Sequence, residues 1–151
     1  MFENISSFFV ATNSSLIDSA LLILRVFIGL CFVVHGLGKL GLVGTGSMAG
    51  FVGWLKSMNI PFADAQARIA MASEIVGGVL ITLGLFHRVG CVLLFVMMIA
   101  ATIIGHRGAG YLITNTPPGN EYTVNLAAIT LALFLTGPGR FSLDMMIFAG
   151  M

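Results

Sequence analysis

The stretch LIDSALLILRVFIGLCFVV, residues 16–34, decides the fold class, because it is one continuous apolar segment with two charged side chains, Asp18 and Arg25. About 20 apolar residues in a helix cross the ~30 Å hydrocarbon core of a bilayer. The residues before it are poor in lysine and arginine, and no small-residue cleavage pattern follows it, which argues against a secretory signal. The stretch is therefore predicted to be a retained membrane span.

Composition extends this prediction to the whole chain. Of its 151 residues, 58% are hydrophobic and 9% are charged, and the mean hydropathy is +1.03. So few polar side chains cannot cover a globule of this size in water, and lipid must face much of its surface. The formal net charge of +1 offers no basic surface for nucleic acid. The sequence predicts an integral membrane protein that does not bind nucleic acid.

Three further apolar runs complete a predicted all-α, four-helix membrane bundle that forms one domain over residues 1–151. With the first run, the predicted spans are about 16–36, 65–85, 89–105 and 122–136. Four spans place both chain ends on one face, the terminal side, and the first and third connections on the opposite face, the loop side. The connection around His87 is so short that the second and third spans must form an antiparallel hairpin. The 19 glycines, several at small-xxx-small spacing, favour close helix packing.

Residues 48–58, in the first connection, are predicted to form a short interfacial helix. Phe51, Trp54, Leu55 and Met58 recur at spacings of three and four, and Pro61 ends the pattern. The alternative interpretation of this segment is a mobile loop.

Two charged residues lie deep in the predicted spans, Arg25 in the first and Glu74 in the second. A charged side chain within a bilayer needs a partner or a polar cavity. Counted at ~1.5 Å per residue from the loop-side ends, both residues reach the middle of the bilayer. The simplest prediction is an ion pair between Arg25 and Glu74. The alternative is that such a buried pair only fixes the register of two helices.

The loop-side ends of the spans carry most of the other polar residues. At about 100° per residue, His35 and Lys39 share one sector of the first helix with Arg25. A lone histidine in a membrane helix is usually structural, but His35 belongs to the sequence H-G-L-G-K, beside a cation. The predicted site has three catalytic residues, Arg25, His35 and Glu74, and five substrate-binding residues, Lys39, His106, Arg107, Glu121 and Asn125.

The side chains at this site favour one class of ligand. Lys39 and Arg107 lie beside two histidines, which favours an anionic or carbonyl-bearing ligand over a metal or haem, so no metal site is predicted. Cys31 and Cys91 are predicted to lie too far apart in height for a disulfide. Cys31 is interpreted as a buried apolar thiol.

The order and spacing of these motifs resemble the DoxX family of small four-helix membrane proteins. The resemblance rests on R-x9-H-G-x-x-K at residues 25–39, on Glu74 followed by Gly77, Gly78, Leu80 and Gly84, on His106, on Glu121 and on the terminal G-P-G-R-x-S-L-D at residues 137–144. It covers residues 22–144. The resemblance implies a multi-pass protein of the bacterial inner membrane linked to redox chemistry; some members are quinone-dependent membrane subunits and others act in thiol stress defence.

Residues and resemblance together lead to one functional hypothesis and one alternative. The hypothesis is a membrane subunit of a redox system that binds a quinone or similar redox-active molecule within the bundle and works with a soluble redox enzyme. The alternative is a non-catalytic scaffold or assembly factor for a redox or stress-defence complex. Self-association into a homo-oligomer is a further expectation. No flavin or dinucleotide motif is evident in the sequence.

Overall fold

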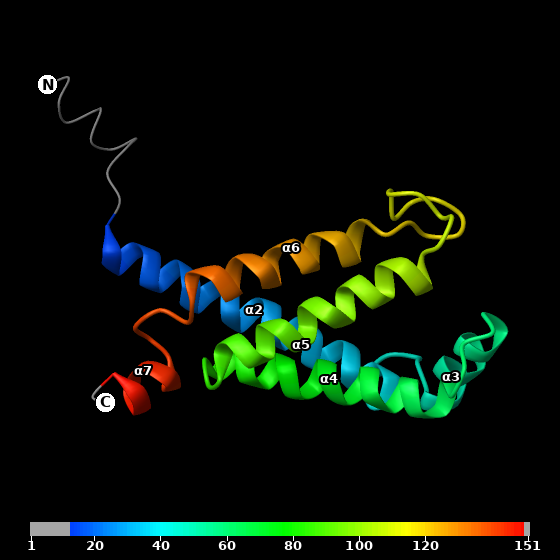
Figure 1. Cartoon of the computed structure of the whole chain (residues 1–151), viewed down its shortest axis with the longest axis horizontal. Coiled ribbons are helices and arrows are strands. Elements are labelled where there is room, and N and C mark those ends of the chain that lie inside the picture. Colours follow the sequence, from blue (N-terminus) through cyan, green and yellow to red (C-terminus); the bar gives the residue numbers. More distant parts are fainter. Residues whose placement is uncertain (1–12, 150–151) are drawn as a thin grey trace, which may run out of the picture.

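The computed structural model describes residues 13–149, and every regular element in that range is a helix (Figure 1). The elements in chain order are α2 (Ser14–Leu40), α3 (Met48–Ser57), α4 (Ala63–Leu83), α5 (His87–Ala100), the π-helical turn η1 (Ala101–Gly105), α6 (Glu121–Thr136) and α7 (Leu143–Phe148). The predicted all-α fold is confirmed.

Three of these helices are long and apolar enough to cross a bilayer: α2, α4 and the continuous helix His87–Gly105, formed by α5 and η1. They correspond to the predicted spans 16–36, 65–85 and 89–105. α2 is longer than predicted, because Asn13 caps its first turn and Gly41 ends it in a left-handed conformation. α6 coincides with the predicted span 122–136. Its 16 residues extend about 24 Å, so its crossing of the membrane stays a prediction.

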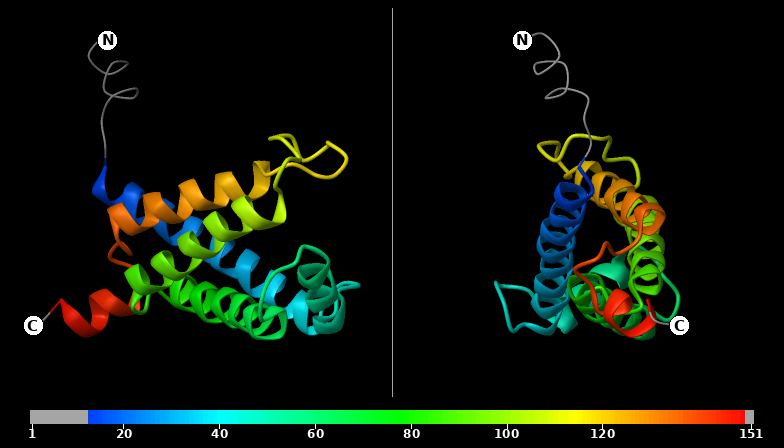
Figure 2. Two further views of the ribbon diagram at one scale, coloured as in Figure 1. Left: turned by 45° about the vertical axis from the view of Figure 1, so that its right-hand side comes forward. Right: turned by 90° about the vertical axis from the view of Figure 1, so that its left-hand side faces the viewer.

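The helices pack in chain order, α2 against α4, α4 against α5, and α5 against α6. α2 and α4 approach most closely at Gly29 and Gly78, where a Cβ added to either glycine would lie 2.5–2.6 Å from the carbonyl oxygen of the other. α2 and α6 lie close together on the terminal side and diverge toward the loop side (Figures 1 and 2). The core is built from fully buried apolar side chains, including Phe32, Ile81, Leu94 and Leu133.

Helix α3 confirms the predicted helix over residues 48–58 and lies at the loop-side ends of α2 and α4 (Figure 1). Ser47 caps its first turn, and Val52 and Leu55 are buried against the start of α4. Trp54 extends in another direction: a Cβ added to Gly105 in η1 would lie 3.0 Å from its ring. α3 therefore joins the loop-side ends of α4 and η1.

The segment after α6, residues 137–149, returns across the terminal side and forms hydrogen bonds with α2, the end of α4 and the start of α5. The carboxylate of Asp144 accepts hydrogen bonds from the backbone N–H groups of Phe86 (2.7 Å) and His87 (2.9 Å) at the start of α5. Its backbone N–H donates to the carbonyl of Gly84 at the end of α4. Asp18 of α2 accepts a hydrogen bond from the backbone N–H of Arg140. This segment closes the terminal side of the bundle.

Replacing the capping carboxylate is expected to loosen this closure. Asp144→Ala should lower the free energy of unfolding by about 2 kcal/mol, because two backbone N–H groups at a helix N-terminus lose a charged acceptor. Unfolding by SDS in mixed micelles, followed by circular dichroism, measures the change. The control is Asp64→Ala, which removes an exposed ion pair with Lys56 and an exposed acidic side chain in the first turn of α4, and it should change stability by less than about 1 kcal/mol. Equal effects of the two substitutions would contradict the capping role.

Candidate functional site

The predicted ion pair between Arg25 and Glu74 is wrong, because Glu74 pairs with Lys39. Arg25 instead donates a hydrogen bond to the carbonyl of Phe141 and lies against Gly84, ten residues beyond Glu74 and thus about 15 Å farther along α4. The prediction counted depth from Gly36 as the loop-side end of the first span. In the structure α2 continues to Leu40.

The register of α2 against α4 explains why Glu74 pairs with Lys39 and not with Arg25. A Cβ added to Gly36 would contact Ile75 and Met71, so Gly36 lies level with the middle of α4 and not with its start. Lys39, one turn beyond Gly36, then reaches Glu74 across the interface. The side chain of Glu74 is 6% exposed and that of Lys39 is 19% exposed, so this ion pair is largely shielded from solvent.

Four of the predicted site residues meet at one cavity, here named the inner cavity. They are His35, Lys39, Glu74 and His106. The cavity has a volume of about 290 Å³ and lies between α2, α3, α4, η1 and the start of α6. Its apolar lining comes from Phe51, Trp54 and Leu55 of α3 and from Met97, Met98 and Ala101 near η1, and Tyr122 of α6 completes it.

Tyr122 links α6 to α2 and was missed by the sequence analysis. Its hydroxyl lies 2.8 Å from Nε2 of His35 and 3.0 Å from Sγ of Cys31, and its ring lies 5.3 Å from that of His35. Cys31 is therefore not simply an apolar thiol but half-buried and hydrogen-bonded. The one sequence signal for Tyr122 was its position next to Glu121, at the start of the fourth predicted span.

His106 is held by the loop that follows η1. Its Nδ1 lies 2.8 Å from the carbonyl oxygen of Pro118. Because a carbonyl only accepts, Nδ1 carries the hydrogen, and Nε2 of a neutral ring is left as an acceptor. The π-helical turn Ala101–Gly105 precedes this residue, and such turns are frequent at functional sites because they redirect the side chains that follow.

The other four predicted site residues do not line the inner cavity. Glu121 and Asn125 line a separate space of about 250 Å³, the outer cavity, with Ile113, Leu126 and Tyr122. Glu121 also accepts a hydrogen bond from the backbone N–H of Ile113. Arg107 is exposed, and Arg25 is fully buried on the terminal side.

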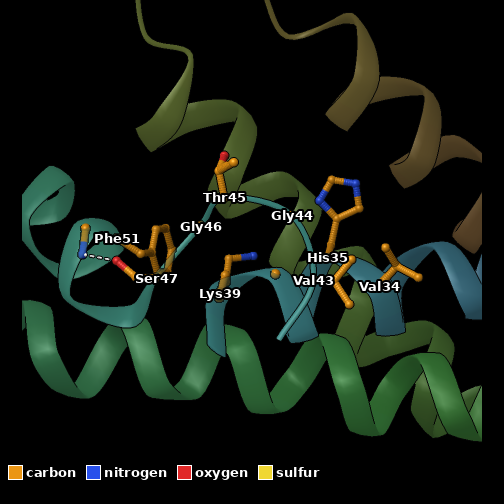
Figure 3. A pocket seen from close by; sticks show the side chains of 11 residues that line it. Val34, His35, Lys39, Val43, Gly44, Thr45, Gly46, Ser47 and Phe51 are labelled. Carbon is orange, nitrogen blue, oxygen red and sulfur yellow. Dashed lines mark hydrogen bonds between the residues drawn. The ribbon is translucent and has the colours of Figure 1, made fainter. Parts of the chain in front are cut away.

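A third space, the loop cavity, is also lined by His35 and Lys39 (Figure 3). Its volume is about 530 Å³, and the 43–47 segment and Phe51 line it with the end of α2. Nζ of Lys39 lies 5.1 Å from the centre of the Phe51 ring. His35 and Lys39 thus form the wall between the loop cavity and the inner cavity. Among residues 13–149, no group of three or more metal-ligating side chains gathers.

Comparison with known proteins identifies relatives of similar length. The chain is 34% identical over 130 residues to the Bacillus subtilis protein named "Putative oxidoreductase CatD", a match that covers 85% of this chain and 87% of that one. It is 32% identical over 130 residues to the Escherichia coli inner membrane protein YphA, covering 82% and 87%. A comparison with solved structures found no match.

The family assignment agrees with the fold. The family model named DoxX matches residues 20–107, a region that contains most of α2 and all of α3, α4, α5 and η1. Three apolar helices of spanning length and the similarity to an inner membrane protein identify a multi-pass inner membrane protein. On this match over more than half of its length, the chain belongs to the DoxX family.

Proposed function

We propose that this protein is the membrane subunit of a redox system and that its inner cavity binds a quinone or a similar redox-active molecule. The observation that carries the proposal is the lining of the cavity, in which aromatic and aliphatic side chains surround a few polar ones. A quinone ring needs both, because its faces are apolar and its two carbonyl oxygens accept hydrogen bonds. The relative named an oxidoreductase supports the redox assignment.

The size of the inner cavity limits the bound part of the ligand to one small ring system. Small-molecule pockets commonly measure ~300–1,000 Å³, and the inner cavity lies at the lower end, at about 290 Å³. One substituted benzoquinone or naphthoquinone head group is of this scale, whereas a dinucleotide or flavin nucleotide is much larger. The electrons therefore come from a reduced cofactor on a soluble partner enzyme and not from a cofactor held in this cavity.

The polar residues of the inner cavity have different roles in the proposed reduction of the quinone. The reduction takes two electrons and two protons and converts both carbonyl oxygens to hydroxyl groups. Lys39 stabilises the negative charge that develops on one oxygen. Glu74 is ionised while it pairs with Lys39, so it first takes up a proton from the loop side and then passes it to one quinone oxygen. His35 passes the second proton, and both side chains line the cavity. His106 fixes the second oxygen when its ring is protonated.

Trp54 provides a direct test of ligand binding, because it lines the inner cavity and is the only tryptophan in the chain. Decylubiquinone added to the purified protein in detergent is expected to quench its fluorescence to saturation. His106→Ala should weaken the Kd by about tenfold, the effect of losing one hydrogen bond of about 1.4 kcal/mol. N-acetyltryptophanamide in the same micelles should be quenched without saturation.

A contrary result has a defined meaning. If Trp54 is quenched linearly, as the free analogue is, and the His106→Ala protein behaves identically, then the inner cavity does not bind quinone. The scaffold function is then favoured when a soluble redox enzyme co-purifies with the quinone-free protein.

A further inference from the structure

The boundary between α2 and α6, here named the seam, has the fewest packing contacts of the boundaries between neighbouring helices in the bundle. Each of the other neighbouring helix pairs packs closely, whereas α2 and α6 diverge toward the loop side (Figures 1 and 2). Near that end they are joined by the hydroxyl of Tyr122, which bonds to His35 and Cys31. Hydrogen bonds between membrane helices are individually weak. This part of the wall is therefore held by bonds that can break and re-form.

Tyr122 separates two cavities. It lines the inner cavity together with His35 and Thr123, and it also lines the outer cavity with Glu121 and Asn125. The outer cavity lies on the outside of the bundle, because its lining residues Asn125 and Ile113 are exposed. Tyr122 is the one residue that lines both cavities, so its side chain is the common boundary between them.

The loop-side approach to the inner cavity is covered by α3. Phe51 and Trp54 stack with ring centres 5.8 Å apart, Trp54 reaches Gly105 in η1, and Lys39 lies over the Phe51 ring. Leu55 is buried beneath them. On this side three side chains, His35, Lys39 and Phe51, lie between the inner cavity and the loop cavity, whereas Tyr122 is the one residue that lines both the inner and the outer cavity.

We propose that the ligand of the inner cavity enters from the lipid phase between α2 and α6, and that Tyr122, bonded to His35, is the gate. The proposal rests on the proposed function for the identity of the ligand and extends it to a substrate class. The ligand carries an apolar tail that stays in the seam and among the acyl chains while the ring passes Tyr122. Glu121 and Asn125 then contact the ring on its way in.

Removing the tyrosine hydroxyl tests the gate kinetically. In Tyr122→Phe the ring remains but its bonds to His35 and Cys31 are lost, so the gate opens more often. Stopped-flow quenching of Trp54 by decylubiquinone should show both the association and the dissociation rate constants raised about fivefold or more, the effect of losing these two weak hydrogen bonds. Tyr122→Phe keeps the ring that lines the inner cavity, and a gate alters both rates alike, so the Kd should change much less than either rate constant. Tyr111→Phe, the same change at the other tyrosine, should leave both rates unchanged.

A second measurement needs no quinone. Ala101→Cys places a thiol in the inner cavity, in a protein whose two native cysteines are replaced by serine. This background removes the Cys31 thiol from every variant compared, so the labelling rates report the remaining bond of Tyr122 to His35. N-phenylmaleimide, which partitions into lipid, should label this thiol faster when Tyr122→Phe is added, but not when Tyr111→Phe is added. Faster labelling without saturable quinone quenching retains the gate and rejects quinone as its ligand. Saturable quenching with unchanged rates and unchanged labelling overturns the gate and leaves the proposed function standing.

Discussion

Gly78→Ala is expected to lower the free energy of unfolding by about 3 kcal/mol, the upper range for inserting a methyl group into a packed interior. The new Cβ would lie 2.6 Å from the carbonyl oxygen of Gly29 and 3.0 Å from the backbone nitrogen of Val33. Both are backbone atoms of α2, so no side chain can turn aside, and the two helices must separate. The interface that sets Lys39 opposite Glu74 is disturbed at the same time.

The matched control is Gly53→Ala, the same change in the exposed interior of α3. A Cβ at Gly53 meets nothing within 4 Å, and alanine is a better helix former than glycine by roughly 0.5–1 kcal/mol. Gly53→Ala should therefore raise stability, whereas Gly78→Ala lowers it. SDS unfolding curves of the two variants measure both changes. The close α2–α4 contact would be refuted by a Gly78→Ala protein as stable as the unchanged one.

Most of the fold could be predicted because lipid imposes strong rules on sequence. A membrane span must be apolar for about 20 residues, so hydropathy alone identifies α2, α4 and the helix His87–Gly105 as candidate spans. The apolar residues of α3 were also sufficient to predict a helix there, since spacings of three and four place them on one helix face. The return of residues 137–144 across the terminal side could not be predicted, because it depends on bonds between distant backbone groups.

The grouping of part of the candidate site could be predicted, while the roles of its residues stay predictions. His35, Lys39 and His106 lie toward the loop-side ends of their helices, Glu74 lies in the middle of α4, and all four line the inner cavity. The partner of Glu74 was wrong because a pairing depends on helix register to within one turn, about 5.4 Å. Hydropathy does not fix where α2 ends to that precision.

The polar residues fall into two groups with different tasks. On the terminal side, Arg25 and Asp144 bond to backbone groups of Phe141, Phe86 and His87, and these bonds hold the closing segment in place. Among residues 13–149, Nε and Nη1 of Arg25 have no hydrogen-bond partner, and Arg25 lines none of the three cavities described above. The inner cavity lies at the other end of α4. The loop-side group is therefore the one to test for ligand chemistry.

The ion pair between Lys39 and Glu74 is expected to serve both packing and ligand binding, and a double substitution separates the two. Lys39→Met should lower the free energy of unfolding by about 3 kcal/mol, because it leaves the Glu74 carboxylate buried without its counter-ion. The doubly substituted protein, Lys39→Met with Glu74→Gln, removes both charges and should regain stability to within about 1 kcal/mol of the original.

Ligand binding should not recover with stability. In the double variant the inner cavity keeps its shape but loses a cation and a carboxylate, so the Kd for decylubiquinone, measured by Trp54 quenching, should be weakened tenfold or more, about 1.4 kcal/mol. Quinone reduction should be lost in the same protein, because a neutral amide at position 74 cannot supply a proton. If the double variant instead recovers both stability and quinone affinity, the pair serves only to set the register of α2 against α4. The proposed roles of Lys39 and Glu74 in binding and reducing the quinone would then be wrong.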